Sequence, residues 1–176
     1  MAKPRLATIW LDGCSGCHMS FLDLDERLFD VFARAELVYG PLVDAKEFPD
    51  EVDVTLVEGA VSTDDDLRRV LEVRAKTKIL VSLGDCAVTA NVPGMRNPIG
   101  PKAILETAYI DHATGEAAPP HTSIPALLAR VEPVHAVVPV DVYLPGCPPS
   151  ADVIAAAIDQ LLAGELPDTS HVASFG

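Results

Sequence analysis

The stretch that decides the fold is Leu6-Ala-Thr-Ile-Trp-Leu-Asp-Gly-Cys14-Ser-Gly-Cys17-His-Met-Ser20. Its apolar and β-branched first part predicts a short buried strand over 6–11, which Asp12-Gly13 ends and in which Trp10 is expected to lie in the core. Apolar residues then recur with helical spacing, which predicts a helix over about 19–34 with Ser20 as its N-cap. A C-x-x-C pair therefore stands where a strand gives way to a helix.

The rest of the chain continues this alternation of strands and helices. Short β-branched runs predict further strands, at 36–39, 52–57, 79–83 and 140–144. Between them, the acidic stretch 62–66 predicts the start of a helix that runs to about residue 76. Ser150 predicts the N-cap of a last helix through Leu162, with Gly164 at its C-cap. This order predicts one doubly wound α/β domain over 1–176, with a mostly parallel sheet and helices on both faces.

One region departs from the pattern. Residues 91–125 contain many prolines and glycines, which predicts a long loop region with one short helix near 103–109. Long loops inside a compact domain are usually functional, so we expect this region to form a contact surface. Residues 133–140 are also interpreted as loop.

Composition limits the classes of partner. The 176 residues are 49% hydrophobic and 22% charged, with a formal charge of −13. Phosphate binding needs clustered Lys and Arg, so nucleic acid and anionic membrane surfaces are not expected partners. The sequence has no run of about 18 apolar residues that would span a bilayer. The short apolar run near the N-terminus does not fit a signal peptide, so we expect a reducing cytoplasmic location.

The chain contains four cysteines, Cys14, Cys17, Cys86 and Cys147. The first two follow the first predicted strand, the third follows the fourth strand, and the last follows the fifth. Parallel strands end along one edge of their sheet, where open α/β sheets build their sites. We therefore expect the four thiols to lie together, as a nearly complete Cys₄ ligand set for an iron–sulfur cluster.

Other chemistry is compatible with the first pair. Cys14-Ser-Gly-Cys17-His18 matches the c-type haem attachment pattern, and a redox-active dithiol can also follow a strand and open a helix. Both interpretations leave Cys86 and Cys147 unexplained. Structural zinc would use all four thiols, although zinc ligands usually come as two close pairs and only one pair is close here. Four unrelated core cysteines would not all be confined to turns at strand ends.

Neighbouring residues fit the cluster hypothesis. Glycines at or near the thiols allow backbone N–H groups to approach the sulfurs. These groups and the positive end of the first helix would both stabilise a reduced cluster. Pro148 would help exclude water, as in the Cys-Pro ending of ferredoxin motifs. The glycines concerned are Gly13, Gly16, Gly84 and Gly146.

Four motifs together carry a family resemblance. They are the Leu-Asp-Gly-Cys-Ser-Gly-Cys-His-Met-Ser stretch at 11–20, Val-Glu-Gly-Ala at 57–60, Gly-Asp-Cys-Ala at 84–87, and Val-Asp-Val-Tyr-Leu-Pro-Gly-Cys-Pro-Pro at 140–149. In this order they resemble the small subunits of nickel–iron hydrogenases, which are related to the 20-kDa subunit of respiratory NADH dehydrogenase. The C-x-x-C spacing favours the hydrogenase side. The short chain, without a twin-arginine leader or a C-terminal cluster domain, is most similar to the cytoplasmic, bidirectional NAD(P)-reducing type.

That resemblance implies a flavodoxin-like domain in which Cys14, Cys17, Cys86 and Cys147 bind one proximal [4Fe-4S] cluster. It also implies a hetero-oligomer in which a large subunit holds the Ni–Fe centre and diaphorase subunits hold FMN and further clusters. This chain would relay electrons from H₂ towards NAD(P)⁺ without a complete active site of its own. No flavin is expected in it, because the loop that binds phosphate in flavodoxins carries the thiols here. A sulfhydrogenase or coenzyme-F420-type hydrogenase remains an alternative, as does a zinc-binding interaction module.

Two further residues have open roles. Glu58 ends a strand at the same edge and matches the family's Glu-Gly position, so it is either a carboxylate near the cluster or the subunit interface, with a role in proton transfer, or a solvated strand-end residue. His18 either hydrogen-bonds a cluster sulfur or lines the interface, or is a polar residue of the first helical turn.

Overall fold

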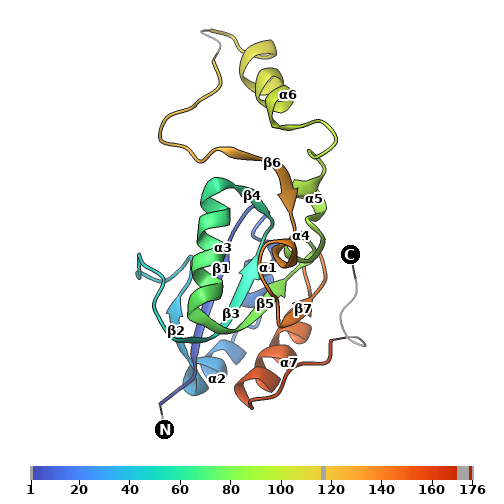
Figure 1. The fold of residues 1–176 in the computed structure, drawn as a ribbon. Coiled ribbons are helices and arrows are strands. Elements are labelled where there is room, and N and C mark those ends of the chain that lie inside the picture. The colour runs from blue at the N-terminus through green and yellow to red at the C-terminus, as the bar shows by residue number, and fades with distance from the viewer. Residues whose placement is uncertain (1, 116–117, 170–174, 176) are drawn as a thin grey trace.

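The centre of the molecule is a five-stranded parallel sheet in the order β2-β1-β3-β5-β7 (Figure 1). The computed structural model describes residues 2–115, 118–169 and 175. This strand order is that of flavodoxin-like folds, and it confirms the predicted α/β class. The strands are β1 (Arg5–Trp10), β2 (Glu36–Tyr39), β3 (Val52–Glu58), β5 (Thr77–Leu83) and β7 (Val142–Leu144).

Helices cover both faces of the sheet, as predicted. On one face α1 (Gly16–Leu22), α2 (Arg27–Arg34) and α7 (Ala151–Leu162) contribute to a core with side chains such as Leu56 and Val81. On the other face α3 (Asp64–Lys76) packs over side chains such as Ile9. The central strands are therefore buried on both sides, which explains their nearly continuous apolar runs.

The helix predicted over 19–34 is two helices, so that prediction is wrong in detail. The chain turns between α1 and α2, and Asp25 takes a left-handed conformation with φ of 50°. Ser20 is not an N-cap, because α1 already begins at Gly16. The Ser20 side chain is instead buried and donates a hydrogen bond to the carbonyl oxygen of Pro149 at 2.6 Å.

The other predicted helix ends agree closely with the structure. Thr63 caps α3, and its side chain accepts from the N–H of Asp66 while the Asp66 carboxylate accepts from the N–H of Thr63. This reciprocal pair is a capping box. Ser150 caps α7 by accepting from the Val153 N–H, and Gly164 follows that helix with φ of +84°.

Residues 91–125 contain more regular structure than predicted. The single short helix expected near 103–109 is found as α6 (Pro101–Glu106) and a π-helical turn, η1 (Thr107–Asp111), and α4 (Asp85–Thr89) and α5 (Asn91–Gly94) precede them. We call residues 95–115 and 118–126 the arm, since they extend beyond the carboxyl edge of the sheet (Figure 1).

A small second sheet lies at the base of the arm. In it β4 (Val61–Thr63) pairs antiparallel with β6 (Leu127–Glu132), and neither strand was predicted. A short 3₁₀ turn, η2 (Val134–Ala136), falls within the region 133–140 that was interpreted as loop. Side-chain bonds from Arg96 to the carbonyls of Ser62 and Leu128 attach the arm to this sheet.

Trp10 is 46% exposed, which contradicts its predicted place in the core. It is the last residue of β1, at the carboxyl edge of the sheet. The residues on either side of it, Ile9 and Leu11, are the ones that enter the core. A large aromatic residue in a buried strand is thus exposed because the strand ends there.

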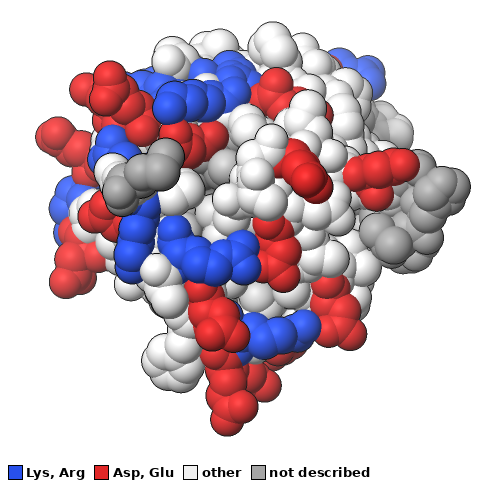
Figure 2. Space-filling view, turned by 90° about the horizontal axis from the view of Figure 1, so that it is seen from below, with Lys and Arg blue, Asp and Glu red and all other residues white. Residues whose placement is uncertain are grey.

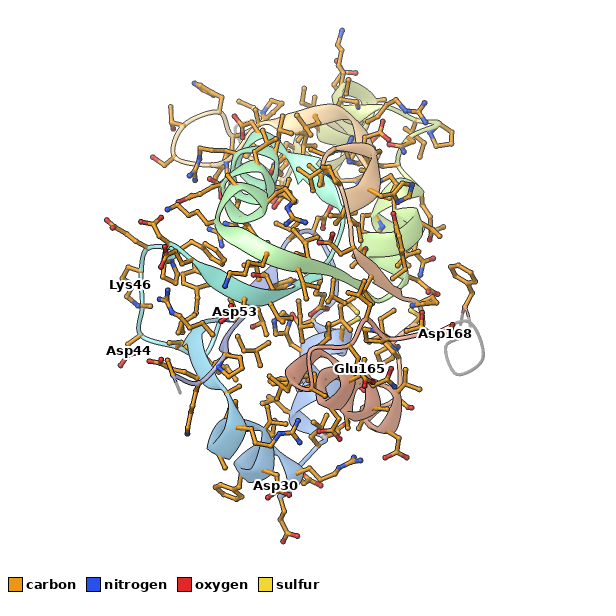
Figure 3. The ribbon with its side chains drawn as sticks, turned by 60° about the horizontal axis from the view of Figure 1, so that its bottom comes forward. Asp30, Asp44, Lys46, Asp53, Glu165 and Asp168 are labelled. Atoms are coloured by element: carbon orange, nitrogen blue, oxygen red, sulfur yellow. The ribbon has the colours of Figure 1, made fainter. Side chains whose placement is uncertain are left out.

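The amino edge of the sheet, seen from below in Figure 2, carries Lys and Arg interspersed with Asp and Glu. Asp53, labelled in Figure 3, accepts hydrogen bonds from Lys78 Nζ and from the Arg5 backbone N–H, both at 2.7 Å. No helix in the described part of the chain has the length and apolarity needed to cross a membrane.

Candidate metal centre

The four cysteines gather at the carboxyl edge of the sheet, as the strand order requires. Cys14 lies in the loop after β1, Cys17 in α1, Cys86 in α4 after β5, and Cys147 after β7. None is in a disulfide. Burial is the largest cause that raises the pKa of the Cys17 thiol, and the negative charges of Glu58, Cys86, Cys14 and Cys147 raise it further. Cys17 is thus within electrostatic reach of all three other thiols.

Glycine is required at Gly84, two residues before Cys86. A Cβ at this position would lie 2.2 Å from the Sγ of Cys17, and φ is +80°. Any side chain here would displace a thiol and strain the backbone. Gly146, directly before Cys147, has φ of +136°, and a Cβ there would lie 2.6 Å from Pro149 Cα.

A buried carboxylate, Asp85, joins the two loops that carry the later cysteines. Its Oδ1 accepts from the Gly146 N–H at 2.7 Å, and its own N–H donates to the Gly146 carbonyl at 2.9 Å. The Gly84 N–H donates to the Leu144 carbonyl in the same way. Sequence reasoning missed Asp85, although its place between a strand-ending glycine and a cysteine was a usable signal.

Glu58 is 2% exposed, so it is not a solvated strand-end residue. Its Oε1 accepts from the Cys17 N–H at 3.3 Å, and its Oε2 accepts from the His18 N–H at 3.0 Å. These are amides of the first turn of α1, which need an acceptor from outside the helix. Glu58 therefore supplies from β3 the cap that was predicted to come from Ser20.

His18 lies beside this carboxylate, because its Nδ1 contacts Glu58 Oε2. Its Nε2 is buried and has no hydrogen-bond partner among the described residues. In this arrangement the ring is oriented by Glu58. Its predicted bond to a cluster sulfur, or contact with a partner, stays a prediction.

Among the remaining predicted neighbours, Gly16 lies close to a thiol. The Gly16 N–H donates to the Sγ of Cys14 at 3.4 Å, as expected for a backbone amide near a sulfur ligand. A Cβ on Gly16 would lie 3.2 Å from that sulfur and 4.0 Å from Pro148 Cβ. Gly13 lies against Gly59: a Cβ on Gly13 would lie 3.4 Å from the Cα of Gly59.

This donor set fits an iron–sulfur cluster. Four uncoordinated thiolates beside a buried carboxylate would repel one another, and cationic iron would relieve that repulsion. A tetrahedral zinc site would draw four sulfurs onto one ion. A cluster takes one thiolate per iron, so its cysteines need only surround it.

Comparison with known proteins identifies the family of this chain. A family model described as NADH ubiquinone oxidoreductase, 20 Kd subunit, matches residues 14–161. The chain is 41% identical over 177 residues to one subunit of the F420-non-reducing hydrogenase of Methanothermobacter thermautotrophicus, covering 96% of this chain and 57% of that protein. It is 40% identical over 167 residues to the delta subunit of the NAD-reducing hydrogenase HoxS of Cupriavidus necator, covering 92% and 80%. The chain thus spans little more than half the length of the archaeal relative.

A solved structure resembles the whole chain. One chain in the crystal structure of an NAD⁺-reducing [NiFe]-hydrogenase in the H₂-reduced state superimposes with a TM-score of 0.95 at 35% identity. The superposition covers 99% of this chain and 100% of that chain. The fold and the sequence similarity therefore identify the same group of proteins.

Proposed function

This chain belongs to the family of the 20 Kd subunit of NADH ubiquinone oxidoreductase, and from that premise we propose that it is the electron-transfer small subunit of an NAD(P)-reducing nickel–iron hydrogenase. One observation carries the proposal: loops after three strands of one parallel sheet bring four unpaired cysteines to a single edge. The similarity of the whole chain to one from an NAD⁺-reducing hydrogenase supports the choice of enzyme.

Cys14, Cys17, Cys86 and Cys147 are the residues that would hold one [4Fe-4S] cluster. Such a cluster exchanges single electrons at a potential that its charge, hydrogen bonds and exposure set. The chain's own contribution is to fix the thiols. The Gly16 N–H donates to Cys14, and Glu58 holds the first turn of α1, which carries Cys17.

The partners follow from this role. We place the Ni–Fe centre in a large subunit, and FMN with further clusters in diaphorase subunits, so that electrons from H₂ cross this chain on the way to NAD⁺ or NADP⁺. We assign no flavin and no complete active site to this chain. The proposal includes a cytoplasmic location and a single cluster-binding domain over residues 1–176.

Metal analysis tests the proposal directly. The chain, purified without oxygen, is expected to contain about four iron and about four acid-labile sulfide. Zinc without sulfide would contradict it, and would support a zinc-binding interaction module instead.

A second candidate is favoured by the 41% identity to one subunit of an F420-non-reducing hydrogenase. In that case the cluster role is the same and the electron acceptor differs. The purified complex should be supplied with H₂ and, in separate assays, with NAD⁺, NADP⁺, coenzyme F420 or elemental sulfur. Reduction of NAD⁺ or NADP⁺ supports the first proposal. Reduction of elemental sulfur, without activity towards either nucleotide or coenzyme F420, supports the second, and reduction of coenzyme F420 contradicts both.

A further inference from the structure

The chain adopts an unfavourable backbone conformation beside the cysteines. Between α4 and α5, Ala90 has φ of +66° and Asn91 has φ of +21°. Residues other than glycine rarely adopt positive φ, although asparagine does so more readily than most. Ala90 is buried against Ala60 and Val131, so the turn is held in place by packing. Such conformations persist where the surrounding structure enforces them, and they gather at functional sites.

The turn directs two donors at two different cysteines. The side-chain amide of Asn91 donates from Nδ2 to the Sγ of Cys147 at 3.7 Å. The backbone N–H of Val92 hydrogen-bonds the Cys86 sulfur, which lowers the pKa of that thiol against the larger raising effect of burial. Cys86 follows β5 and Cys147 follows β7, so a single turn connects the ends of both strands.

Asn91 differs from the other donors near the thiols. Gly16 and Val92 offer backbone amides, which any residue other than proline would also offer. Asn91 alone among these three acts through a side chain. The identity of this residue therefore decides whether Cys147 receives the bond.

We propose that Asn91 is a positioning residue that fixes the Cys147 thiolate and raises the reduction potential of the cluster assigned above. The inference rests on the proposed function, since it needs a cluster at this site. An N–H donor stabilises a cluster more when it has gained an electron, because the sulfurs then carry more negative charge. Removal of the amide makes the potential more negative.

Two substitutions of Asn91 separate the side chain from the turn. Asn91→Gly removes the amide and tolerates positive φ, so the backbone keeps its path. Asn91→Asp keeps the shape, removes the donor and adds a negative charge near the sulfur. Val92→Ala is the matched control, since it alters an exposed neighbouring side chain and keeps the N–H that reaches Cys86.

The experiment compares the wild-type chain with the three variants, each purified in full length without oxygen. Iron and sulfide are counted first, and the midpoint potential is then measured by redox titration monitored by electron paramagnetic resonance. We expect unchanged cluster content in all four proteins. The midpoint should be more negative in Asn91→Gly, more negative still in Asn91→Asp, and unchanged in Val92→Ala.

The outcomes distinguish this inference from the proposed function. A wild-type chain without iron and sulfide overturns both. A wild-type cluster with an unaltered midpoint in Asn91→Gly and Asn91→Asp overturns only the role of Asn91. An equal shift in Val92→Ala also overturns it, because the effect would then belong to the turn. If Asn91→Gly loses its cluster, the midpoint potential of the isosteric Asn91→Asp variant is the test: a more negative value supports the role of Asn91, and an unaltered value overturns it.

Discussion

Glu58 combines deep burial with hydrogen bonds to a helix that comes 40 residues earlier in the chain. Its two oxygens satisfy the N–H groups of Cys17 and His18, and one of them also contacts the His18 ring. Removal of a buried acceptor leaves its donors without a partner, and this lowers the free energy of unfolding by more than the hydrogen bond itself contributes to it. Glu58 thereby determines where α1 begins.

The substitution Glu58→Gln tests this role. Gln keeps one acceptor oxygen and replaces the other by an NH₂ donor, so one of the two backbone N–H groups loses its acceptor and we expect a loss of stability of about 2 kcal/mol. Thermal or urea-induced unfolding of the purified chain measures the change. Glu36→Gln, at an exposed position of β2, is the control and should leave the unfolding transition in place. An unchanged transition in Glu58→Gln would show that the carboxylate is not needed as a cap.

The cysteines that stand alone in sequence give a second test. Cys86→Ser and Cys147→Ser are each expected to abolish hydrogen-dependent NAD⁺ reduction, because a serine hydroxyl is a poor replacement for a cluster thiolate. Activity and iron content are measured together, with Val92→Ala as control. Wild-type activity with full iron in either variant would remove that residue from the ligand set.

Sequence reasoning at this scale identified residues whose type is rare or chemically specific. The position of the four cysteines at strand ends predicted that they lie together, because the ends of parallel strands lie along one edge of the sheet. It missed Asp85 and Asn91, since Asp and Asn are ordinary loop residues until their partners are known. It placed Trp10 in the core for its apolar character, and could not anticipate that β1 ends there.

At the scale of elements, the capping box of α3 is the clearest local interaction that fixes where a helix begins. Thr63→Ala removes the side-chain acceptor for the Asp66 N–H, and we expect a loss of about 1 kcal/mol. Chemical denaturation measures the effect, and Thr122→Ala at an exposed position of the arm is a suitable control. Equal stabilities of the two variants would mean that the cap contributes nothing measurable.

The strands of the main sheet were predictable because burial on both faces leaves uninterrupted apolar runs. Strands β4 and β6 were not predictable, because their pairing joins segments more than 60 residues apart and their sequences lack a clear alternation of apolar and polar residues. The division of the predicted helix into α1 and α2 was also hidden. It comes from a turn in which Asp25 takes a left-handed conformation, and no break in the apolar pattern marks that turn.

At the scale of the whole molecule, the two edges of the sheet differ. The amino edge carries ion pairs such as that of Lys78 with Asp53; Asp53 is labelled in Figure 3. Burial opposes ionisation of Asp53, but hydrogen bonds from Lys78 and the Arg5 backbone outweigh it and lower the pKa of this carboxyl.

A lowered pKa in the folded state stabilises the protein at pH values above the unfolded pKa, near 3.9, and this contribution is lost as pH falls through the folded value. Asp53→Asn should therefore be less stable than wild type by about 1 kcal/mol at pH 7. The difference should shrink as pH falls below about 4. Urea titrations at both pH values check this, and a difference that persists in acid would contradict the assignment.

The carboxyl edge continues into the arm, whose exposed apolar side chains include Met95 at 71% and Ile99 at 63% exposure. Large apolar side chains exposed on one segment suit a protein contact. We expect Met95→Asp and Ile99→Asp to weaken co-purification with the large subunit. Phe29→Asp, on α2 and 77% exposed, is the matched control. Equal recovery of the large subunit from all three variants would contradict this role for the arm.

The cap that Glu58 provides also has a consequence for synthesis. Helix α1 has seven residues, too few to be stable alone, and its acceptor lies 41 positions after Cys17. On the ribosome, the first turn of α1 therefore lacks its acceptor until β3 has emerged, and the last thiol, Cys147, emerges later still. Assembly factors that deliver iron and sulfide would meet the complete proposed set of ligands only after Cys147 has emerged.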